Sequence, residues 1–457
     1  MNRYAIIAKG RPLADIERIA KEYGGSDMTY APAVGQLFCT LDPSAAARLN
    51  NVDGLTVKQL KRVSTKYTDA LQVSVPEKQI TLPRQGLATP LDTYSALVSS
   101  TAPYWYEVAS SFDPPITGAG GTCAILDSGV RKTHRGLLGK VIYEKNFSNS
   151  PTLEDIYNHG TAVAYALCGG QFAEHQDQGI APGVLVVSIK VLDDDGEGDE
   201  ENVVLGLNEV IRLIDEAYDA GHVSLDPEVI TSVNLSFGEP DDGDPDNPLR
   251  VACRAVRGAH EEKYGWKMPV VAAAGNGGPV PGSIVCPACD PEVWAVGAAN
   301  ISPYGVSSYS SRGPTLEGHV KPDIVFYGTN ITLASSADDD SYVVKSGTSF
   351  AVPFAVGAGF NLWEILRRVD PEGAESLTTE ELLHWISQVS VKPEGLPVDK
   401  DNDYGYGLPS GGVLAQMMTG AAVPGLITSG IISMVVPIMG LAMVGMMMSG
   451  MTKGMRG

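Results

Sequence analysis

Three polar residues that are far apart in the sequence have the types and the order of an acyl-transfer centre. Asp127 ends an apolar run, His159 precedes a stretch of small residues, and Ser349 follows Gly347 and Thr348 at the start of an apolar helical pattern. A carboxylate, an imidazole and a hydroxyl can act as orienter, base and nucleophile once a fold brings them together. The free backbone N–H groups at a helix start also favour negative charge nearby. Each residue alone has a plainer interpretation, as a buried Asp, a capping His or a capping Ser.

Alternating strand and helix patterns between about residues 101 and 414 can position these side chains. We expect strands at 122–126, 184–191, 230–235, 270–274 and 294–298, and helices at 159–168, 201–220, 248–264 and 349–368. This alternation predicts an α/β fold with a mostly parallel sheet and helices on both faces. In such sheets, sites form beyond the carboxyl ends of the strands. Asp127, His159 and Asn276 all lie at or just after such ends.

The N-terminal part predicts a separate small α+β module. Strand patterns at 4–8, 36–41 and 55–60 alternate with helical patterns at 13–23 and 42–49. Residues 63–100 are polar, spaced by prolines and weakly patterned, which predicts a linker. The chain begins with a strand pattern and lacks the long apolar run of a secretory signal.

Composition excludes some functions and leaves others open. The formal net charge of −21 argues against a nucleic-acid partner, for which a basic face is expected. It fits cationic substrates, a salty environment or simply a solvated acidic surface. The spacing of Cys286 and Cys289 matches half a zinc site, but no second pair completes it, so a loop disulfide or two free thiols are the better interpretations.

The C-terminal end carries a candidate membrane segment. No charged residue occurs from 421 to 448, and Lys453 and Arg456 follow. This stretch is long enough to cross a bilayer, although Pro424 and Pro437 would kink it. We expect membrane association through this segment, with a buried helical hairpin or a partner-binding tail as the alternatives. The side of the membrane stays open, because the two cations favour a cytoplasmic end while no signal would export the rest.

Several motifs, taken in order, resemble those of the subtilisin-like serine proteases over about residues 1–418. The blocks are Asp127-Ser128-Gly129, His159-Gly160-Thr161, Ala272-Ala273-Ala274-Gly275-Asn276, Ser310-Ser311-Arg312-Gly313-Pro314, Lys321-Pro322-Asp323, Gly347-Thr348-Ser349 with Pro353, and Tyr404-Gly405-Tyr406-Gly407. The N-terminal module is similar to the inhibitory propeptides of that family. The resemblance implies a propeptide-like inhibitory domain at 1–62, a linker with a possible processing site at 63–100, a subtilisin-like catalytic domain at 101–418 and an apolar tail at 419–457.

The resemblance also implies roles for individual residues. Asp127, His159 and Ser349 would form the catalytic triad of a serine endopeptidase, and Asn276 would donate its side-chain amide to the oxyanion. The substrate would be a protein or peptide lying as an extended strand between two edges of the sheet, and the chain's own propeptide would inhibit the same cleft. The implied substrate-binding residues are Gly196, Gly198, Ser236, Phe237, Gly238 and Asp241. The acidic run 239–244 suggests a preference for basic residues, and a solvated loop is its plainer interpretation.

Departures from the family pattern bear on metals and on alternatives. No cofactor is required, and calcium is possible but not at the family's usual strong site, because Gly136 replaces an aspartate and 171–179 lacks the expected motif. The acidic runs at 193–195 and 338–340 could bind a cation weakly or be surface carboxylates. The alternative functions are a catalytically degenerate scaffold and a single-substrate maturation protease that docks through its tail.

Overall fold

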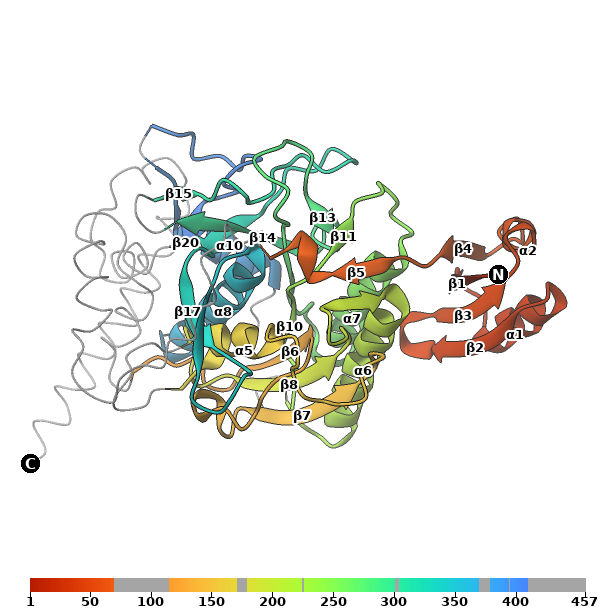
Figure 1. Ribbon diagram of the computed structural model, residues 1–457, viewed down its shortest axis with the longest axis horizontal. Coiled ribbons are helices and arrows are strands. Elements are labelled where there is room, and N and C mark those ends of the chain that lie inside the picture. The colour runs from red at the N-terminus through yellow and green to blue at the C-terminus, as the bar shows by residue number, and fades with distance from the viewer. Residues whose placement is uncertain are drawn as a thin grey trace, which may run out of the picture.

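An eight-stranded sheet forms the centre of the larger part of the molecule in the computed structural model (Figure 1). The structure describes residues 1–69, 115–170, 179–223, 226–300, 304–369, 379–393 and 395–409. The strand order is β15-β14-β12-β10-β6-β8-β7, with β16 also paired to β14, and only the β14–β15 pair is antiparallel. The strands are β6 (Thr122–Asp127), β7 (Val141–Asn146), β8 (Leu185–Lys190), β10 (Ser232–Leu235), β12 (Val270–Ala273), β14 (Trp294–Asn300), β15 (Gly305–Val306) and β16 (Ile324–Tyr327). The predicted mostly parallel α/β sheet is therefore confirmed.

Helices cover both faces of this sheet. The helices are α5 (Gly160–Cys168), α6 (Glu200–Asp219), α7 (Pro248–Tyr264), α8 (Thr348–Val369) and α10 (Thr379–Gln388). Helix α6 packs against α7, and α5 packs against α8. Successive side chains of a strand point to opposite faces, so Leu126 of β6 can touch Gly206 of α6 while Asp127 lies against Gly160 of α5. Helices α5 and α8, which the sequence pattern placed from residues 159 and 349, thus begin at residues 160 and 348 on the same face of the sheet.

The N-terminal module is a four-stranded antiparallel sheet with two helices (Figure 1). Its elements are β1 (Asn2–Ala8), α1 (Leu13–Glu22), β2 (Ser26–Ala31), β3 (Gln36–Leu41), α2 (Pro43–Leu49) and β4 (Leu55–Gln59). The sequence did not predict β2, which lies at the sheet edge and is mostly polar and exposed. One face of the sheet buries its own core, in which Ile6, Ile16 and Leu37 are fully buried.

The other face of the module docks on α6 and α7. Ala5 and Phe38, which alternate with the residues of the module core, join the main hydrophobic core. The short helix η1 (Pro32–Val34) packs against both α6 and α7. Ala33 donates its backbone N–H to Asn208 Oδ1 at 2.8 Å, and Gln36 Nε2 donates to the carbonyl of Pro248 at 2.9 Å. The module is therefore packed onto the larger part through buried apolar and polar contacts.

The beginning of the predicted linker is a strand of the larger part. Strand β5 (Arg62–Ser64) pairs with β9 (Glu197–Asp199), and the chain continues through the short helix η2 (Thr65–Tyr67) to residue 69. Residues 70–100 of the predicted linker lie outside the described residues, as does the apolar tail at 419–457. Among the described residues, only α8 is long and apolar enough to span a membrane, but 94% of its most apolar window is buried inside the molecule. That burial is typical of a core helix.

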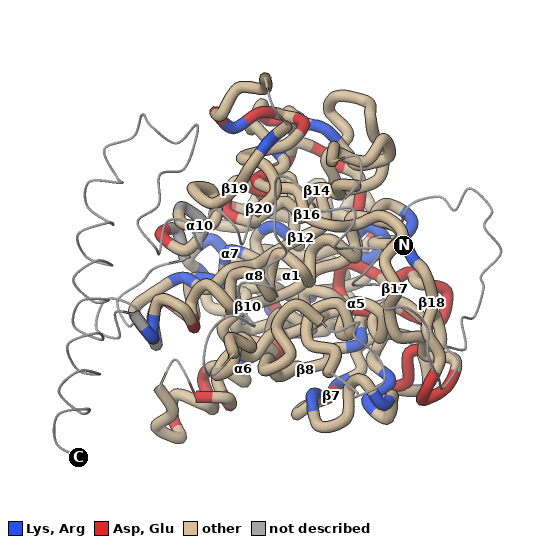
Figure 2. The backbone as a smooth tube through the Cα atoms, turned by 90° about the vertical axis from the view of Figure 1, so that its left-hand side faces the viewer, with Lys and Arg blue, Asp and Glu red and all other residues tan. Residues whose placement is uncertain are grey.

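Acidic residues are spread over many surface segments of the described chain and alternate with basic ones, as Figure 2 shows. The acidic run 338–340 is paired in this way. Asp339 lies 2.7 Å from Arg131, and Asp340 lies 2.7 Å from Arg135. Two carboxylates of this run are thus neutralised by neighbouring arginines.

Candidate active site

Asp127 and His159 form a buried pair at the carboxyl end of β6. Asp127 Oδ1 lies 2.7 Å from His159 Nδ1, and both side chains are almost completely buried. Asp127 Oδ1 also accepts the backbone N–H of Ser128 at 2.7 Å, which fixes the carboxylate. A carboxylate in this place holds the imidazole in one orientation and favours a proton on Nδ1. His159 Nε2 is then the nitrogen that faces the cleft.

Asp155, which sequence reasoning missed, holds the loop that carries His159. Its Oδ1 accepts the backbone N–H groups of Asn158 at 2.9 Å and His159 at 3.2 Å and the hydroxyl of Ser128 at 2.7 Å, and its Oδ2 accepts the N–H of Thr161 at 2.8 Å. Burial raises the pKa of the Asp155 carboxyl, while the hydrogen bonds from Thr161 and Ser128 act against this rise. The signal in the sequence was an aspartate in the loop just before His159 and helix α5.

Ser349 lies in the first turn of α8, beside His159 but not bonded to it. Its hydroxyl donates to the carbonyl of Ser236 at 2.9 Å, and the Ser236 hydroxyl donates to the carbonyl of Ser349 at 2.7 Å. The ring centre of the next residue, Phe350, is 5.3 Å from that of His159. The structure thus brings the three predicted triad residues to one place, with the serine hydroxyl turned away from the base.

Asn276 follows β12 and presents an unpaired amide to the same place. Its Oδ1 accepts the backbone N–H and the hydroxyl of Thr348, both at 3.1 Å, which orients the amide group. Within the described part of the chain, its Nδ2 is buried and has no hydrogen-bond partner. A buried donor without a partner costs stability unless something binds there. The amide is placed to receive an additional oxygen.

The chain's own residues 62–69 run through the cleft, first as the extended strand β5 and then, at residues 65–67, as one short helical turn. Ser64 exchanges two backbone hydrogen bonds with Gly238, at 2.9 and 3.2 Å, and Thr65 N–H donates to Gly196 at 3.1 Å. Val63 is paired with Gly198. Further along, Asn276 N–H donates to the carbonyl of Tyr67 at 2.6 Å, Ser349 N–H donates to that of Thr68 at 3.2 Å, and Asp69 is paired with Gly347.

Most of the predicted substrate-binding residues therefore touch this segment. Gly196, Gly198 and Gly238 pair with it through the backbone, and the carbonyl of Ser236 accepts the Thr68 hydroxyl at 3.0 Å. Phe237 is fully buried in the main core, so its side chain does not line the cleft. A side chain at residue 198 would meet the backbone of Val191 at 2.6 Å, which shows why glycine is needed there.

Asp69 contacts the imidazole of His159, an interaction that the sequence did not indicate. Its Oδ1 lies 3.0 Å from His159 Nε2, within ion-pair distance, although the two groups are not aligned as a hydrogen bond. Burial lowers the pKa of His159, but the charges of Asp127 and Asp69 outweigh that effect and raise the pKa to about 10. The imidazole is thereby held as an imidazolium between two carboxylates.

A cavity of about 330 Å³ opens beside Asn276. Ile284 and Val285 supply apolar walls, Asp241 stands at the border, and Lys66 and Tyr67 of the cleft segment also line it. Both Asp241 oxygens already accept backbone N–H groups, Oδ1 from Gly243 at 2.9 Å and Oδ2 from Leu316 at 2.9 Å. A side chain of a bound peptide can enter this cavity.

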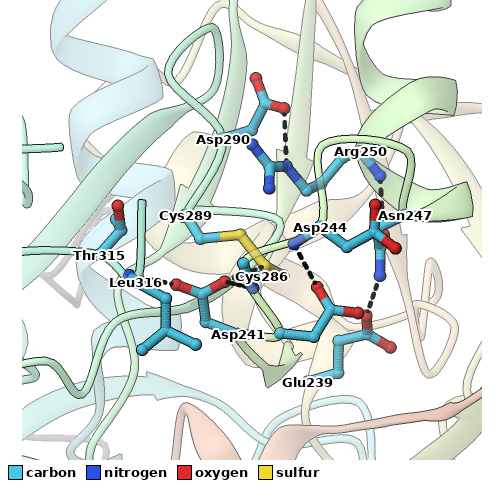
Figure 3. Close-up of a disulfide and its surroundings, with 12 residues drawn as sticks. Glu239, Asp241, Asp244, Asn247, Arg250, Cys286, Cys289, Asp290, Thr315 and Leu316 are labelled. Atoms are coloured by element: carbon cyan, nitrogen blue, oxygen red, sulfur yellow. Dashed lines mark hydrogen bonds and ion pairs between the residues drawn. A yellow bond between two sulfur atoms is a disulfide. The ribbon is translucent and has the colours of Figure 1, made fainter. Parts of the chain in front are cut away.

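A disulfide joins Cys286 and Cys289, and Cys286 directly follows Val285 of the cavity wall (Figure 3). Cys286 belongs to β13 (Val285–Cys286), which pairs with β11 (Glu239–Pro240), and Asp241 lies next to its sulfur. Of the two interpretations that the sequence left open, the disulfide is therefore correct. Asp241 and the two sulfurs lie within 4.8 Å of one another, but bonded sulfurs are not thiolate ligands, so this group does not fit a metal.

The fold and this site together define a class. A parallel α/β sheet that carries a buried Asp–His pair at the end of one strand, with a serine in the first turn of a neighbouring helix, is the architecture of subtilisin-like α/β proteins. The chain belongs to the Peptidase S8 group, the subtilase family, whose sequence pattern matches residues 118–407.

Individual relatives agree with this placement. The chain is 31% identical to the serine protease AprX of Bacillus subtilis over 53% of this chain and 56% of AprX, so it matches only about half of that relative. It is 26% identical to a subtilisin of Bacillus sp. (strain TA39), over 68% of this chain and 79% of the relative. Among solved structures, fervidolysin from Fervidobacterium pennivorans, a keratinolytic enzyme related to subtilisin, shares the fold with a TM-score of 0.64 at 19% identity, over 91% of this chain and 61% of fervidolysin.

Subtilases need no organic cofactor, and calcium is commonly bound in the family. Residue 136 is a glycine without room for a side chain, because an added Cβ would meet the Tyr165 ring at 2.4 Å. In the run 193–195, Asp193 accepts two backbone N–H groups, and Asp194 lies 3.0 Å from Lys190. Residues 171–178, part of the loop expected to lack a calcium motif, are outside the described residues. Position 136 therefore offers no calcium ligand, and Asp193 and Asp194 are already engaged by groups of the protein itself.

Proposed function

We propose that this chain is a serine endopeptidase with Ser349 as nucleophile, His159 as general base and Asp127 as the orienting carboxylate. The observation that carries the proposal is the buried 2.7 Å contact between Asp127 and His159 next to the helix start that bears Ser349. In the reaction, His159 Nε2 takes the proton of the serine hydroxyl as the oxygen attacks a peptide carbonyl. It then returns that proton to the leaving amine, while Asp127 stabilises the imidazolium.

The tetrahedral oxyanion would be bound by two donors. The backbone N–H of Ser349 already contacts a carbonyl oxygen, that of Thr68, and the unpaired Nδ2 of Asn276 supplies the second donor. These donors are fixed before the reaction, since Thr348 orients the Asn276 amide and α8 orients the backbone. Preorganised donors of this kind stabilise the transition state without reorganisation.

The chain would be made as a self-inhibited precursor. Residues 62–69 fill the position in which a substrate strand is expected, between Gly196–Gly198 and Gly238. The preceding module is packed against α6 and α7, which tethers the segment in place. A tethered segment competes at a high effective concentration with any free peptide. These contacts support a propeptide role for residues 1–62 and an extended-strand mode for substrates.

A preference for basic residues is the less supported part of the proposal. Asp241 borders the cavity, but its oxygens are used by backbone N–H groups, and the nearby walls are apolar. The other carboxylates of the run also have partners in the chain itself: Asp242 and Glu239 pair with Lys61, and Asp244 pairs with Lys58. A panel of peptides that differ only in the residue before the cut tests this preference, and equal or faster cleavage after Leu or Phe would refute it.

An active-site-directed fluorophosphonate tests the enzyme itself. We expect the mature protein to be labelled and the Ser349→Ala variant to stay unlabelled. An unlabelled wild-type protein would favour a degenerate scaffold instead. Digestion of casein distinguishes a general endopeptidase from a protease that is restricted to one maturation event.

Membrane association through residues 419–457 is a separate proposal whose support is the uncharged stretch from 421 to 448. A stretch of this length without charge partitions favourably into a bilayer. We expect the full chain to remain with membranes after alkaline extraction, and a chain ending at residue 418 to be released. Equal partitioning of the two chains would refute an anchoring role.

A further inference from the structure

The Thr68–Asp69 peptide bond lies at the nucleophile in the orientation of a substrate. The carbonyl oxygen of Thr68 accepts the backbone N–H of Ser349 at 3.2 Å, where the oxyanion would form. On the N-terminal side of this bond the segment pairs with Gly238 and Gly196, and on the C-terminal side Asp69 pairs with Gly347. The chain therefore crosses the cleft from one side of Ser349 to the other at this bond.

Two other requirements for cleavage of that bond are not met. His159 Nε2 must accept the proton of Ser349, yet it lies 3.0 Å from the carboxylate of Asp69. The Ser349 hydroxyl points to the carbonyl of Ser236 instead. An imidazolium has no lone pair on Nε2, so it cannot act as a general base. The Thr68 carbonyl thus contacts one oxyanion donor, the N–H of Ser349, while Asn276 Nδ2, the base and the nucleophile are not engaged with it.

We propose that Thr68–Asp69 is the self-processing site of this chain, and that the Asp69 carboxylate delays its own release by holding the catalytic base. The inference rests on the proposed serine endopeptidase function. When Asp69 moves away from His159, the neutral imidazole can take the Ser349 proton and Ser349 Oγ adds to the Thr68 carbonyl carbon. The C–N bond then breaks, and the amine of Asp69 leaves with that proton. Water hydrolyses the resulting ester, which yields the Thr68 carboxylate and restores the Ser349 hydroxyl.

The surroundings of His159 favour the charged imidazole. Asp127 faces it from β6 and Asp69 from the cleft segment, whereas Asp155 of the preceding loop accepts the backbone N–H of His159. On the packed elements, Lys345 Nζ lies 5.8 Å from the ring centre of Phe350, and that ring centre lies 5.3 Å from the ring centre of His159. Tyr157 also borders the ring. Removing the Asp69 charge takes away the carboxylate on the side from which the serine proton must come.

The test compares full-length chains that carry Asp69→Asn or Asp53→Asn with the wild type. Asparagine keeps the shape of the side chain without its charge, and Asp53 is an exposed aspartate of the N-terminal module that serves as the matched control. Mass spectrometry at early times should detect a fragment that ends at Thr68. We expect Asp69→Asn to speed its release about tenfold, because each unit by which the pKa of His159 falls raises the neutral fraction about tenfold. Asp53→Asn should behave as the wild type does.

A second measurement does not depend on cleavage. In the Ser349→Ala chain, ¹⁵N NMR of His159 at pH 8 should show an imidazolium, and adding Asp69→Asn should lower its pKa. The carboxylates stabilise the charged imidazole in the folded precursor. This stabilisation is complete below pH 6.5 and is lost as the pH rises through about 10. Self-cleavage should therefore speed up toward alkaline pH.

The outcomes separate this inference from the proposed function. A first cut at another bond refutes Thr68–Asp69 as the processing site. An unchanged cleavage rate in Asp69→Asn, together with a neutral His159 in the precursor, refutes the proposal that Asp69 keeps His159 protonated. In both cases, labelling of Ser349 by the fluorophosphonate would still support the proposed endopeptidase function. If no chain is labelled, the proposed function itself fails.

Discussion

Replacement of Asp155 by alanine should destabilise the folded chain and impair catalysis together. The carboxylate is 2% exposed and accepts three backbone N–H groups, those of Asn158, His159 and Thr161. A buried N–H that loses its acceptor costs about 1–3 kcal/mol. Burial raises the pKa of Asp155, so the ionised group itself is disfavoured inside the fold, and its removal offsets part of this cost. We therefore expect a loss of about 3 kcal/mol in the free energy of unfolding.

The isosteric variant Asp155→Asn makes the prediction sharper. Its amide oxygen can keep the bonds of Oδ1, but its NH₂ group would face the N–H of Thr161, so we expect a loss of about 1 kcal/mol. Loosening of the loop displaces His159, and a displacement of about 1 Å can cost about a hundredfold in rate. Peptide hydrolysis by Asp155→Ala should accordingly fall between about tenfold and about a hundredfold in kcat.

Urea unfolding in the Ser349→Ala background, which avoids self-digestion, measures the stability. Asp338→Ala is the matched control, because Asp338 also accepts a backbone N–H, that of Asp340 at 2.9 Å, but on an exposed loop. We expect that control to stay within about 0.5 kcal/mol of its parent. If Asp155→Ala unfolds with the same free energy as Asp338→Ala and retains full kcat, Asp155 does not hold the loop and the reasoning fails.

Three further predictions concern the oxyanion donor, a buried acid and the disulfide. Asn276→Ala should lower kcat by about a hundred- to a thousandfold with little change in KM, a magnitude carried over from the same type of donor in subtilisin; a tenfold change or less in peptide hydrolysis would argue against the role. Burial, with the charge of Glu200, raises the pKa of Glu239 to about 8, so the folded state holds an extra proton and the unfolding free energy should fall as the pH rises from 4.5 to about 8. Glu239→Gln should flatten that dependence in thermal unfolding, and an unaltered pH profile would contradict it. Replacing Cys286 and Cys289 by alanine opens a loop with a sequence separation of 3 and should lower the free energy of unfolding by about 2 kcal/mol. The KM for peptides should rise because the cavity wall loosens. An unchanged midpoint of urea unfolding would contradict the prediction.

The sequence predicted the large elements well because their burial follows directly from residue type. Helix α7 begins at Pro248 and ends at Tyr264 as expected, since Asn247 caps it and Gly265 ends it with a φ of 81°. The strands that end at Asp127 and near Asn276 are continuous apolar runs, typical of a parallel sheet that is covered on both faces. Strand β2 escaped prediction because an exposed edge strand has no apolar alternation.

The sequence predicted only those residues of the candidate site that belong to recognisable motifs. The pairing of Asp127 with His159 followed from order and resemblance, whereas Asp155 acts through acceptor geometry that no spacing rule encodes. The orientation of the Asn276 amide depends on Thr348, which lies 72 positions away in the sequence. The sequence is the same whether two cysteines are bonded or free, so only the structure shows that Cys286 and Cys289 form a disulfide.

The path of residues 62–69 shows why the contact of Asp69 with the base lies beyond sequence reasoning. Backbone pairing with Gly238 and Gly196 accepts almost any side chain, so nothing in the sequence fixes which residue reaches Ser349. Between Thr65 and Thr68 the chain makes a helical turn, and that turn brings Lys66 and Tyr67 to the cavity before Thr68 meets the nucleophile. A fully extended path from Ser64 would have carried a different carbonyl to the N–H of Ser349. The position of Asp69 against His159 is therefore a consequence of one local turn, and changes in that turn should alter the processing site and the hold on the base together.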